Sequence, residues 1–429
     1  MQAFIPPSII YPLAWAIDFA IPSLLKIVQN IDEVIVSEKD KEMLRSLRND
    51  RMIFASNHPT TAEPPISFYL SNIMGARFHY MAARQVFDWD YGMVGKLISS
   101  IGAFSVLAGT SDRESLKQSR KILSEPKGKL VLFPEGEPTS GENDSLMPLQ
   151  PGVAQLGFWG YEDAKKLDPN ADITVLPAFM KYVINEEEKE IRNHLDKSAK
   201  NLEKKLGIAP GNKNILRRFL TIGRNTLEKA EREYKVESPK DSVWDFRIGR
   251  VRHAILDGVA DKFNIQSYDR KQDAIMKLRQ LLAILEMILV GYPDPKLPKM
   301  TKEDLEWARK ECLKAFDLIV IKPEYLMGYP SPERFYEWLI RLEAYILDKT
   351  PRMLGGERPH LSRKAYVYFA KPFRLSEYYD SYKKDKKKTV EEVSQRLRID
   401  IQRLMDNCIL SLSKPLVKPN DIGDDVYGY

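Results

Sequence analysis

The sequence predicts an α/β fold in which a mostly parallel sheet is flanked by helices and interrupted by an all-α region. Two observations support this prediction. Between residues 52 and 184, short apolar runs alternate with segments of helical periodicity, a pattern typical of parallel strands joined by helices. After Ile184 the periodicity is helical and densely charged, and strand character returns only near Ala365.

The first part of the chain contains the elements expected of the sheet. The expected strands are short apolar runs over residues 52–55, 78–82, 103–107, 130–133 and 173–183. The expected helices between them have apolar residues three or four positions apart and cover residues 62–73, 92–101, 111–123 and 151–166. Because each helix connects two strands, the strands are expected to run largely parallel.

The region from 185 to 363 is expected to be all helical. Its periodic segments cover residues 201–206, 215–236, 243–264, 270–290 and 302–316, and prolines between 293 and 298 break the series. A further helix is predicted after Ser331, an N-cap residue type, with Pro332 at its first position. Beyond this region we expect a strand over 365–373 and a charged helix over 389–410.

The N-terminal segment, residues 1–35, is apolar and aromatic but is interrupted by prolines and by Asp18. It falls short of the ~20 continuous apolar residues of a membrane span, and no basic residues or cleavage site suggest a signal peptide. Two interpretations fit. Trp15 and Phe19 can lie at a lipid headgroup boundary, as in a monotopic anchor, or the segment can cover the core of its own protein.

The amino-acid composition limits the partners and the compartment expected for this protein. A net charge of +6 from 66 basic and 60 acidic residues gives no strong basic field, so nucleic acid is not an expected partner. A mild positive excess suits an anionic membrane surface. Cys312 and Cys408 offer neither a disulfide framework nor metal-ligand spacing, and we interpret both as packing residues of a protein in a reducing compartment.

The candidate catalytic group is a histidine with a carboxylate close behind it. His58 and Glu63 follow the apolar run 52–55, where a helical pattern begins, so the two side chains are expected to meet across one helical turn. An imidazole held by a carboxylate on one nitrogen can take a proton from an alcohol on the other. Such a pair also arises by chance in a long chain, so the pair alone carries little weight.

Three further motifs strengthen this interpretation. The chain contains Asn57–Pro64, then Gly102–Val106, then Phe133-Pro134-Glu135-Gly136, then Val175–Ala178. This order resembles the glycerolipid acyltransferases, in particular those that acylate 1-acylglycerol 3-phosphate. The resemblance implies a glycerol-3-phosphate acyltransferase-like fold.

The resemblance also implies a reaction, its partners and a location. His58 would be the base and Glu63 would orient it, while Asn57, Phe133, Pro134, Glu135 and Gly136 would contact the substrate. The acyl group would pass from acyl-CoA or acyl carrier protein, as co-substrate, to a lysolipid or glycerolipid acceptor. No cofactor or metal is expected. The protein would sit on the cytoplasmic side of a membrane, peripheral or monotopic.

The chain departs from the family pattern at positions that concern substrate. Glu63 stands where family members usually have aspartate, and Glu137-Pro138 stands where many have Thr-Arg. An arginine usual after the central box is replaced by Ala108. Guanidinium groups commonly hold phosphate, and Arg113 is the nearest arginine that could replace the missing one. Arg113 is equally well interpreted as an exposed helix residue paired with an acidic neighbour.

These departures leave two other functions open. One is a catalytically weak relative that binds a lipid or a protein partner through its helical region. The other is a thioesterase-like hydrolase in which His58 activates water.

The resemblance also organises the chain into domains. In the family, a strand like 365–373 and a terminal helix close the acyltransferase domain. We therefore predict an acyltransferase domain formed by 36–184 and 364–412, a helical insertion over 185–363 and a tail over 413–429. The alternative is two consecutive domains, with a fortuitous strand at Ala365.

Overall fold

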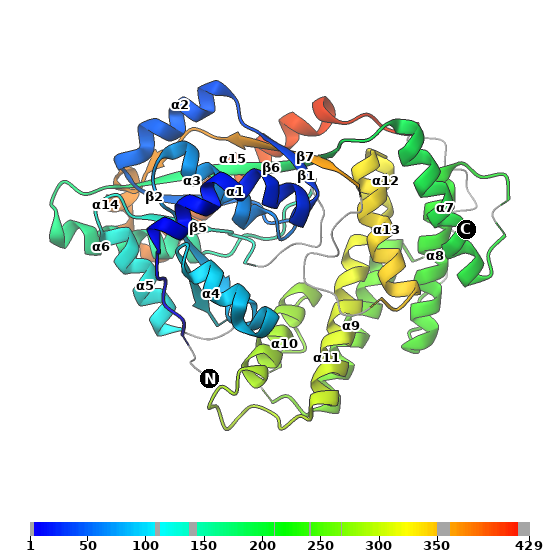
Figure 1. The fold of residues 1–429 in the computed structure, drawn as a ribbon. Coiled ribbons are helices and arrows are strands. Elements are labelled where there is room, and N and C mark those ends of the chain that lie inside the picture. Colours follow the sequence, from blue (N-terminus) through cyan, green and yellow to red (C-terminus); the bar gives the residue numbers. More distant parts are fainter. Residues whose placement is uncertain are drawn as a thin grey trace.

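The structure, a computed structural model, describes residues 4–107, 112–136, 144–209, 211–239, 242–266, 268–349 and 361–418. Its centre is an eight-stranded sheet in the order β1-β7-β6-β2-β5-β3-β4, with β8 beside β6 (Figure 1). The strands are β1 (Ile31–Ile35), β2 (Arg51–Ser56), β3 (His79–Ala83), β4 (Ala103–Val106), β5 (Lys129–Leu132), β6 (Ile173–Ile184), β7 (Arg363–Phe369) and β8 (Phe373–Arg374).

Helices cover both faces of the sheet. One face carries α1 (Tyr11–Gln29), α2 (Glu38–Ser46) and α3 (Glu63–Met74), and the other carries α5 (Arg113–Ser124), α6 (Gly152–Leu167) and α15 (Lys386–Leu412). Along β2, Met52 and Phe54 pack in the first layer, whereas Ile53 and Ala55 pack in the second. Burial on both faces explains why these strands are continuous apolar runs, and it confirms the predicted α/β class.

Short elements complete this part of the molecule. They are η1 (Leu47–Asn49), η2 (Arg84–Gly92), α4 (Met93–Ser99), η3 (Leu375–Tyr378) and α14 (Tyr379–Lys384). The helices expected over 62–73, 92–101, 111–123 and 151–166 correspond to α3, α4, α5 and α6.

A separate hydrophobic core holds the helices between β6 and β7. These helices are α7 (Glu188–Leu206), α8 (Ile215–Glu233), α9 (Trp244–Lys262), α10 (Ala274–Leu289), α11 (Lys302–Val320), α12 (Pro323–Gly328) and α13 (Pro332–Ile346). As predicted, Ser331 caps α13, and its side chain accepts a hydrogen bond from the Arg334 backbone nitrogen. Figure 1 shows this helical region beside the α/β part.

The strand expected near Ala365 lies in the main sheet. β7 pairs antiparallel with β6, with Phe369 opposite Ala178 and Arg363 opposite Ile184, and parallel with β1. Both ends of the helical region therefore enter neighbouring strands of one sheet. The first residues of the predicted tail pack on that region, since the Leu416 backbone nitrogen donates to the Pro330 carbonyl at 2.9 Å. Residues 419–429 and 350–360 lie outside the described residues.

The predicted N-terminal segment, 1–35, needs a correction. Residues 31–35 form β1, a strand of the main sheet, so the α/β part begins before residue 36. α1 runs through Pro22 without ending, and it is the described helix whose length and hydropathy would allow it to cross a membrane.

The two faces of α1 differ. On its inner face Ala14, Ile21 and Leu25 join the core over α3, and the Asp18 carboxylate pairs with Arg77. Its outer face carries exposed Trp15 and Phe19.

Candidate active site

His58 lies in the loop that follows β2. Its Nδ1 is 2.7 Å from Oε2 of Glu63, the first residue of α3. The predicted pair therefore forms, but not across a helical turn, since the loop from 57 to 62 folds back to bring the ring onto the start of the helix. The longer glutamate, in place of the family's usual aspartate, reaches the ring at hydrogen-bonding distance.

Glu63 is fully buried and surrounded by donors. Besides His58, its carboxylate accepts hydrogen bonds from the Thr60 backbone nitrogen at 3.1 Å, the Thr60 hydroxyl at 2.8 Å and the Tyr182 hydroxyl. Burial raises the pKa of Glu63, but the hydrogen bond and charge of His58, with the Tyr182 and Thr60 hydrogen bonds, outweigh it and leave the pKa lowered. An ionised carboxylate only accepts, so Nδ1 carries the ring proton and Nε2 is left as the base.

The ring of His58 is also held by stacking. Its centroid lies 4.2 Å from that of Phe133, with an angle of 22° between the planes. The side chain remains 13% exposed, whereas that of Glu63 is 0% exposed. Glu63 is therefore shielded from water, whereas His58 is partly accessible.

Phe133-Pro134-Glu135-Gly136 forms a tight turn after β5. The Gly136 backbone nitrogen donates to the Phe133 carbonyl at 2.9 Å, and Gly136 has φ of +83°. The positive φ favours glycine, and a Cβ at this position would lie 1.9 Å from Nε2 of Gln150, so that side chain would have to move. The Pro134 carbonyl accepts from the Gln150 backbone nitrogen at 2.7 Å, which closes the loop.

Glu135 uses its carboxylate to hold the backbone of the base, and its contact with substrate stays a prediction. Oε1 accepts from the His58 backbone nitrogen and Oε2 from the Met147 backbone nitrogen, both at 2.8 Å. Burial raises the pKa of Glu135 to about 7, and the charge of Glu63 also raises it. The two backbone hydrogen bonds and the charge of Arg279 lower the pKa but do not cancel the effect of burial. Glu135 thus joins the His58 loop to the 144–150 segment.

Asn57, the other polar residue expected at the substrate, is buried against β6. Its side-chain amide donates to the Met180 carbonyl at 3.0 Å and its side-chain oxygen accepts from the Met180 nitrogen at 2.8 Å. Because both polar groups of the amide are used by the backbone of β6, Asn57 continues the sheet hydrogen bonding and fixes the start of the loop.

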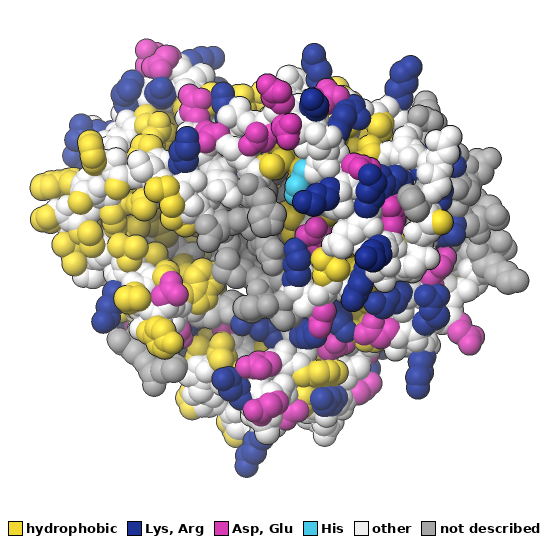
Figure 2. Space-filling model, turned by 45° about the vertical axis from the view of Figure 1, so that its right-hand side comes forward, with side chains coloured by type: hydrophobic (Ala, Val, Ile, Leu, Met, Phe, Trp, Pro, Cys, Tyr) yellow, Lys and Arg dark blue, Asp and Glu magenta, His cyan; other side chains and the backbone are white. Residues whose placement is uncertain are grey.

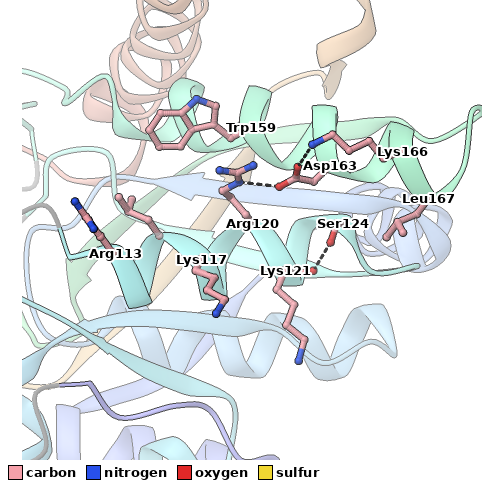
Figure 3. A pocket seen from close by; sticks show the side chains of 10 residues that line it. Arg113, Lys117, Arg120, Lys121, Ser124, Trp159, Asp163, Lys166 and Leu167 are labelled. Atoms are coloured by element: carbon pink, nitrogen blue, oxygen red, sulfur yellow. Dashed lines mark hydrogen bonds and ion pairs between the residues drawn. The ribbon is translucent and has the colours of Figure 1, made fainter.

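Arg113, the predicted phosphate ligand, lies on the surface at the first turn of α5. It lines one end of a groove of about 670 Å³ between α5 and α6 (Figure 3). The cations Arg120 and Lys166 of this groove pair with Asp163 at 2.7 and 2.9 Å. Within the described chain, no hydrogen bond or ion pair joins Arg113 to His58 or Glu63. Ala108 and Glu137-Pro138 lie outside the described residues.

Two residues of the site have no signal in the sequence motifs. Tyr182 lies near the end of the largely apolar β6, on the face that meets α3, and the Arg363 guanidinium lies 4.8 Å from the centre of its ring. Arg279 comes from α10 of the helical region and donates through Nη2 to the Glu135 carbonyl at 2.9 Å. Among the described residues, no three His, Cys, Asp or Glu side chains form a group that could hold a metal.

Comparison with known proteins gives a family match for the segment that contains this site. The family model described as Acyltransferase matches residues 35–181. No curated protein shows significant similarity to the chain. The matched segment holds His58, Glu63 and the Phe133–Gly136 turn at the carboxyl ends of adjacent strands β2 and β5. Residues 35–181 therefore form a domain that matches the Acyltransferase family.

Proposed function

We propose that the protein transfers a fatty acyl group from a thioester, acyl-CoA or acyl carrier protein, to a hydroxyl of a lysolipid or glycerolipid acceptor. The observation that carries the proposal is the His58–Glu63 pair at 2.7 Å, with the carboxylate fully buried and the imidazole 13% exposed, within a domain that matches the acyltransferase family.

The reaction follows from this geometry. Nε2 of His58 takes the proton of the acceptor hydroxyl while its oxygen attacks the thioester carbonyl carbon, and Glu63 stabilises the imidazolium that forms. The tetrahedral intermediate collapses by breaking the carbon–sulfur bond. The leaving thiolate then takes the proton back from Nε2, so the base is restored and no covalent enzyme intermediate is needed.

The competing hydrolase function is tested by acceptor dependence. Purified protein is given an acyl thioester with and without a lysolipid, and released thiol, free fatty acid and acylated lipid are measured. We expect thiol release to require the acceptor and to match the acylated lipid formed. Equal release of free acid in both samples would instead identify a hydrolase, and lysolipid binding without thiol release would identify a non-catalytic relative.

Replacing Tyr182 with phenylalanine tests how Glu63 is held. The change removes one donor from the Glu63 carboxylate with little change in volume, so the carboxylate pKa should rise. We expect the rate at neutral pH to fall about tenfold, the effect of one hydrogen bond to a charged group, and the acid limb of the pH–rate profile to move to higher pH. The matched control is Tyr336→Phe in the helical region, whose hydroxyl contacts His194 at 2.8 Å.

An unchanged acid limb in Tyr182→Phe would contradict the role given to this hydroxyl. A loss of rate equal to that of Tyr336→Phe would contradict it too, since that outcome reflects stability alone.

We further propose that the protein works at a membrane surface, held there by α1. Figure 2 shows hydrophobic side chains gathered over the left of the view. On α1, Phe19 is 92% and Trp15 is 62% exposed. The segment before α1 is hydrogen-bonded to the C-terminal end of α4, a helix on which Met93 and Leu97 are also exposed. Such a set of exposed aromatic and aliphatic residues is suited to the headgroup boundary of a lipid bilayer.

A double substitution, Trp15→Glu with Phe19→Glu, should abolish sedimentation with phosphatidylcholine–phosphatidylglycerol vesicles while leaving the fold intact, because both side chains point outward. Leu167→Glu is the matched control, since Leu167 is 70% exposed at the end of α6, which covers the opposite face of the sheet. Equal vesicle binding by the double variant and the wild type would contradict this orientation.

A further inference from the structure

The helical region between β6 and β7 contacts the acyltransferase domain at its candidate site. On α10, Arg279 donates to the Glu135 carbonyl at 2.9 Å. Further along the same helix, buried Glu286 accepts from the Gln85 backbone nitrogen of η2 at 3.3 Å. α10 is therefore held at two points on the acyltransferase domain, one of which is the turn that carries Glu135.

The contact at Arg279 leads to the base by a short series of hydrogen bonds. Arg279 holds the main chain of Glu135, whose carboxylate holds the backbone nitrogens of His58 and Met147 at 2.8 Å. An ionised carboxylate accepts more strongly from both nitrogens than a protonated one, whose hydroxyl oxygen is a weaker acceptor. The positive charge of Arg279 favours the ionised form of this buried group.

A second contact secures the same loop from the other side. Buried Asp144 pairs with Lys181 of β6 and with Arg334 of α13, the latter at 3.0 Å. The described segment from 144 to 150 is thus fixed between the sheet and the helical region, and it contains the Met147 nitrogen that Glu135 holds.

From these contacts we propose that the helical region completes the active site, with Arg279 as a positioning residue that holds the Phe133–Gly136 turn and, through Glu135, the backbone of His58. This inference rests on the proposed function for its consequence in catalysis. The structural part of this inference, that α10 orders the His58 loop, can be tested without an activity measurement.

The variants are Arg279→Ala and Arg279→Lys, the second keeping the charge but not the planar group of donors. The matched control is Arg192→Ala, because Arg192 of α7 also donates through Nη2 to a backbone carbonyl, that of Leu416 in the tail, which packs on the helical region. Circular dichroism selects the variants that keep the wild-type fold.

Hydrogen exchange measures the structural part. In Arg279→Ala, the His58 and Met147 amides should exchange about 10- to 100-fold faster than in the wild type, with a smaller change in Arg279→Lys and none in Arg192→Ala. Wild-type exchange of both amides in Arg279→Ala would overturn the proposal, whether or not the protein proves to be a transferase.

Kinetics measure the catalytic part with two acceptors, lysophosphatidic acid and the uncharged monoacylglycerol. Arg279→Ala should lower kcat for both about 10- to 100-fold, with little change in KM. Because the charges that act on Glu135 are those of Arg279 and Glu63, loss of Arg279 should also move the acid limb to higher pH. A rise in KM confined to lysophosphatidic acid, with kcat intact, would overturn positioning in favour of direct phosphate binding. A wild type inactive on both acceptors would count against the proposed function, while the exchange result still decides the positioning role.

Discussion

Replacing His58 with alanine is expected to abolish acyl transfer, with a fall in rate of ~10²–10⁴ or more, because the variant has no group in place of Nε2 to take the acceptor proton. The backbone hydrogen bond from residue 58 to Glu135 remains, so the loop should keep its path. The measurement is the initial rate of thiol release in the presence of lysolipid, alongside thermal unfolding.

His58→Ala should also be less stable than the wild type, because of its effect on the buried carboxylate of Glu63. In the wild type His58 contributes to the lowered pKa of buried Glu63, and without it the carboxylate keeps the burial cost with fewer compensating interactions. A group with a lowered folded-state pKa stabilises the protein above its unfolded pKa and loses this effect as pH falls through the folded value. We therefore expect a loss on the order of 1–3 kcal/mol at neutral pH, shrinking toward acid pH.

His194→Ala is the control for this experiment. His194 is also half-buried, and its ring is stacked on and bonded to Tyr336 in the helical region. Transfer by His194→Ala should be close to that of the wild type. Unchanged turnover in a folded His58→Ala protein would refute the assignment of the base.

Replacing Glu63 with glutamine is expected to have the second-largest effect, a rate loss of ~10²–10⁴. The amide keeps the size of the side chain but removes the negative charge that stabilises the imidazolium. Its NH₂ group would also face one of the donors that now point at the carboxylate, Thr60 or Tyr182. The kinetic readout is kcat, because the loss falls on the chemical step, and KM for the acceptor should change little.

Glu63→Asp separates charge from reach. Aspartate keeps the charge but draws the carboxylate back by one methylene from both His58 and Tyr182, so we expect activity between those of the wild type and Glu63→Gln. Wild-type kcat in Glu63→Gln would show that the carboxylate is not needed to orient or stabilise the imidazole. If Glu63→Asp were no more active than Glu63→Gln, the reach of the side chain would matter as much as its charge.

Much of the α/β part was predictable because its strands are buried on both faces. That burial makes β2, β5 and β6 continuous apolar runs bounded by polar residues, and the sequence shows such runs directly. β1 was not predicted, since only Ile31 of its five residues is buried. Its place in the sheet is decided by pairing with β7, which lies far along the chain. Prolines and Asp18 interrupt the apolar run of the N-terminal segment, yet α1 packs its inner face on the core and continues as one helix through Pro22.

The sequence by itself determined the α/β class, the His58–Glu63 pair and the Phe133–Gly136 turn, because each depends on residues close together in the chain. Only the tertiary structure decided how this pair is supported. Tyr182 reaches Glu63 because β6 lies beside β2 in the sheet, and Arg279 reaches the Glu135 turn because α10 packs on the α/β part. The tertiary structure likewise made Asn57 and Glu135 residues that hold the loop, since a buried polar side chain needs a hydrogen-bond partner and the fold places backbone groups beside both.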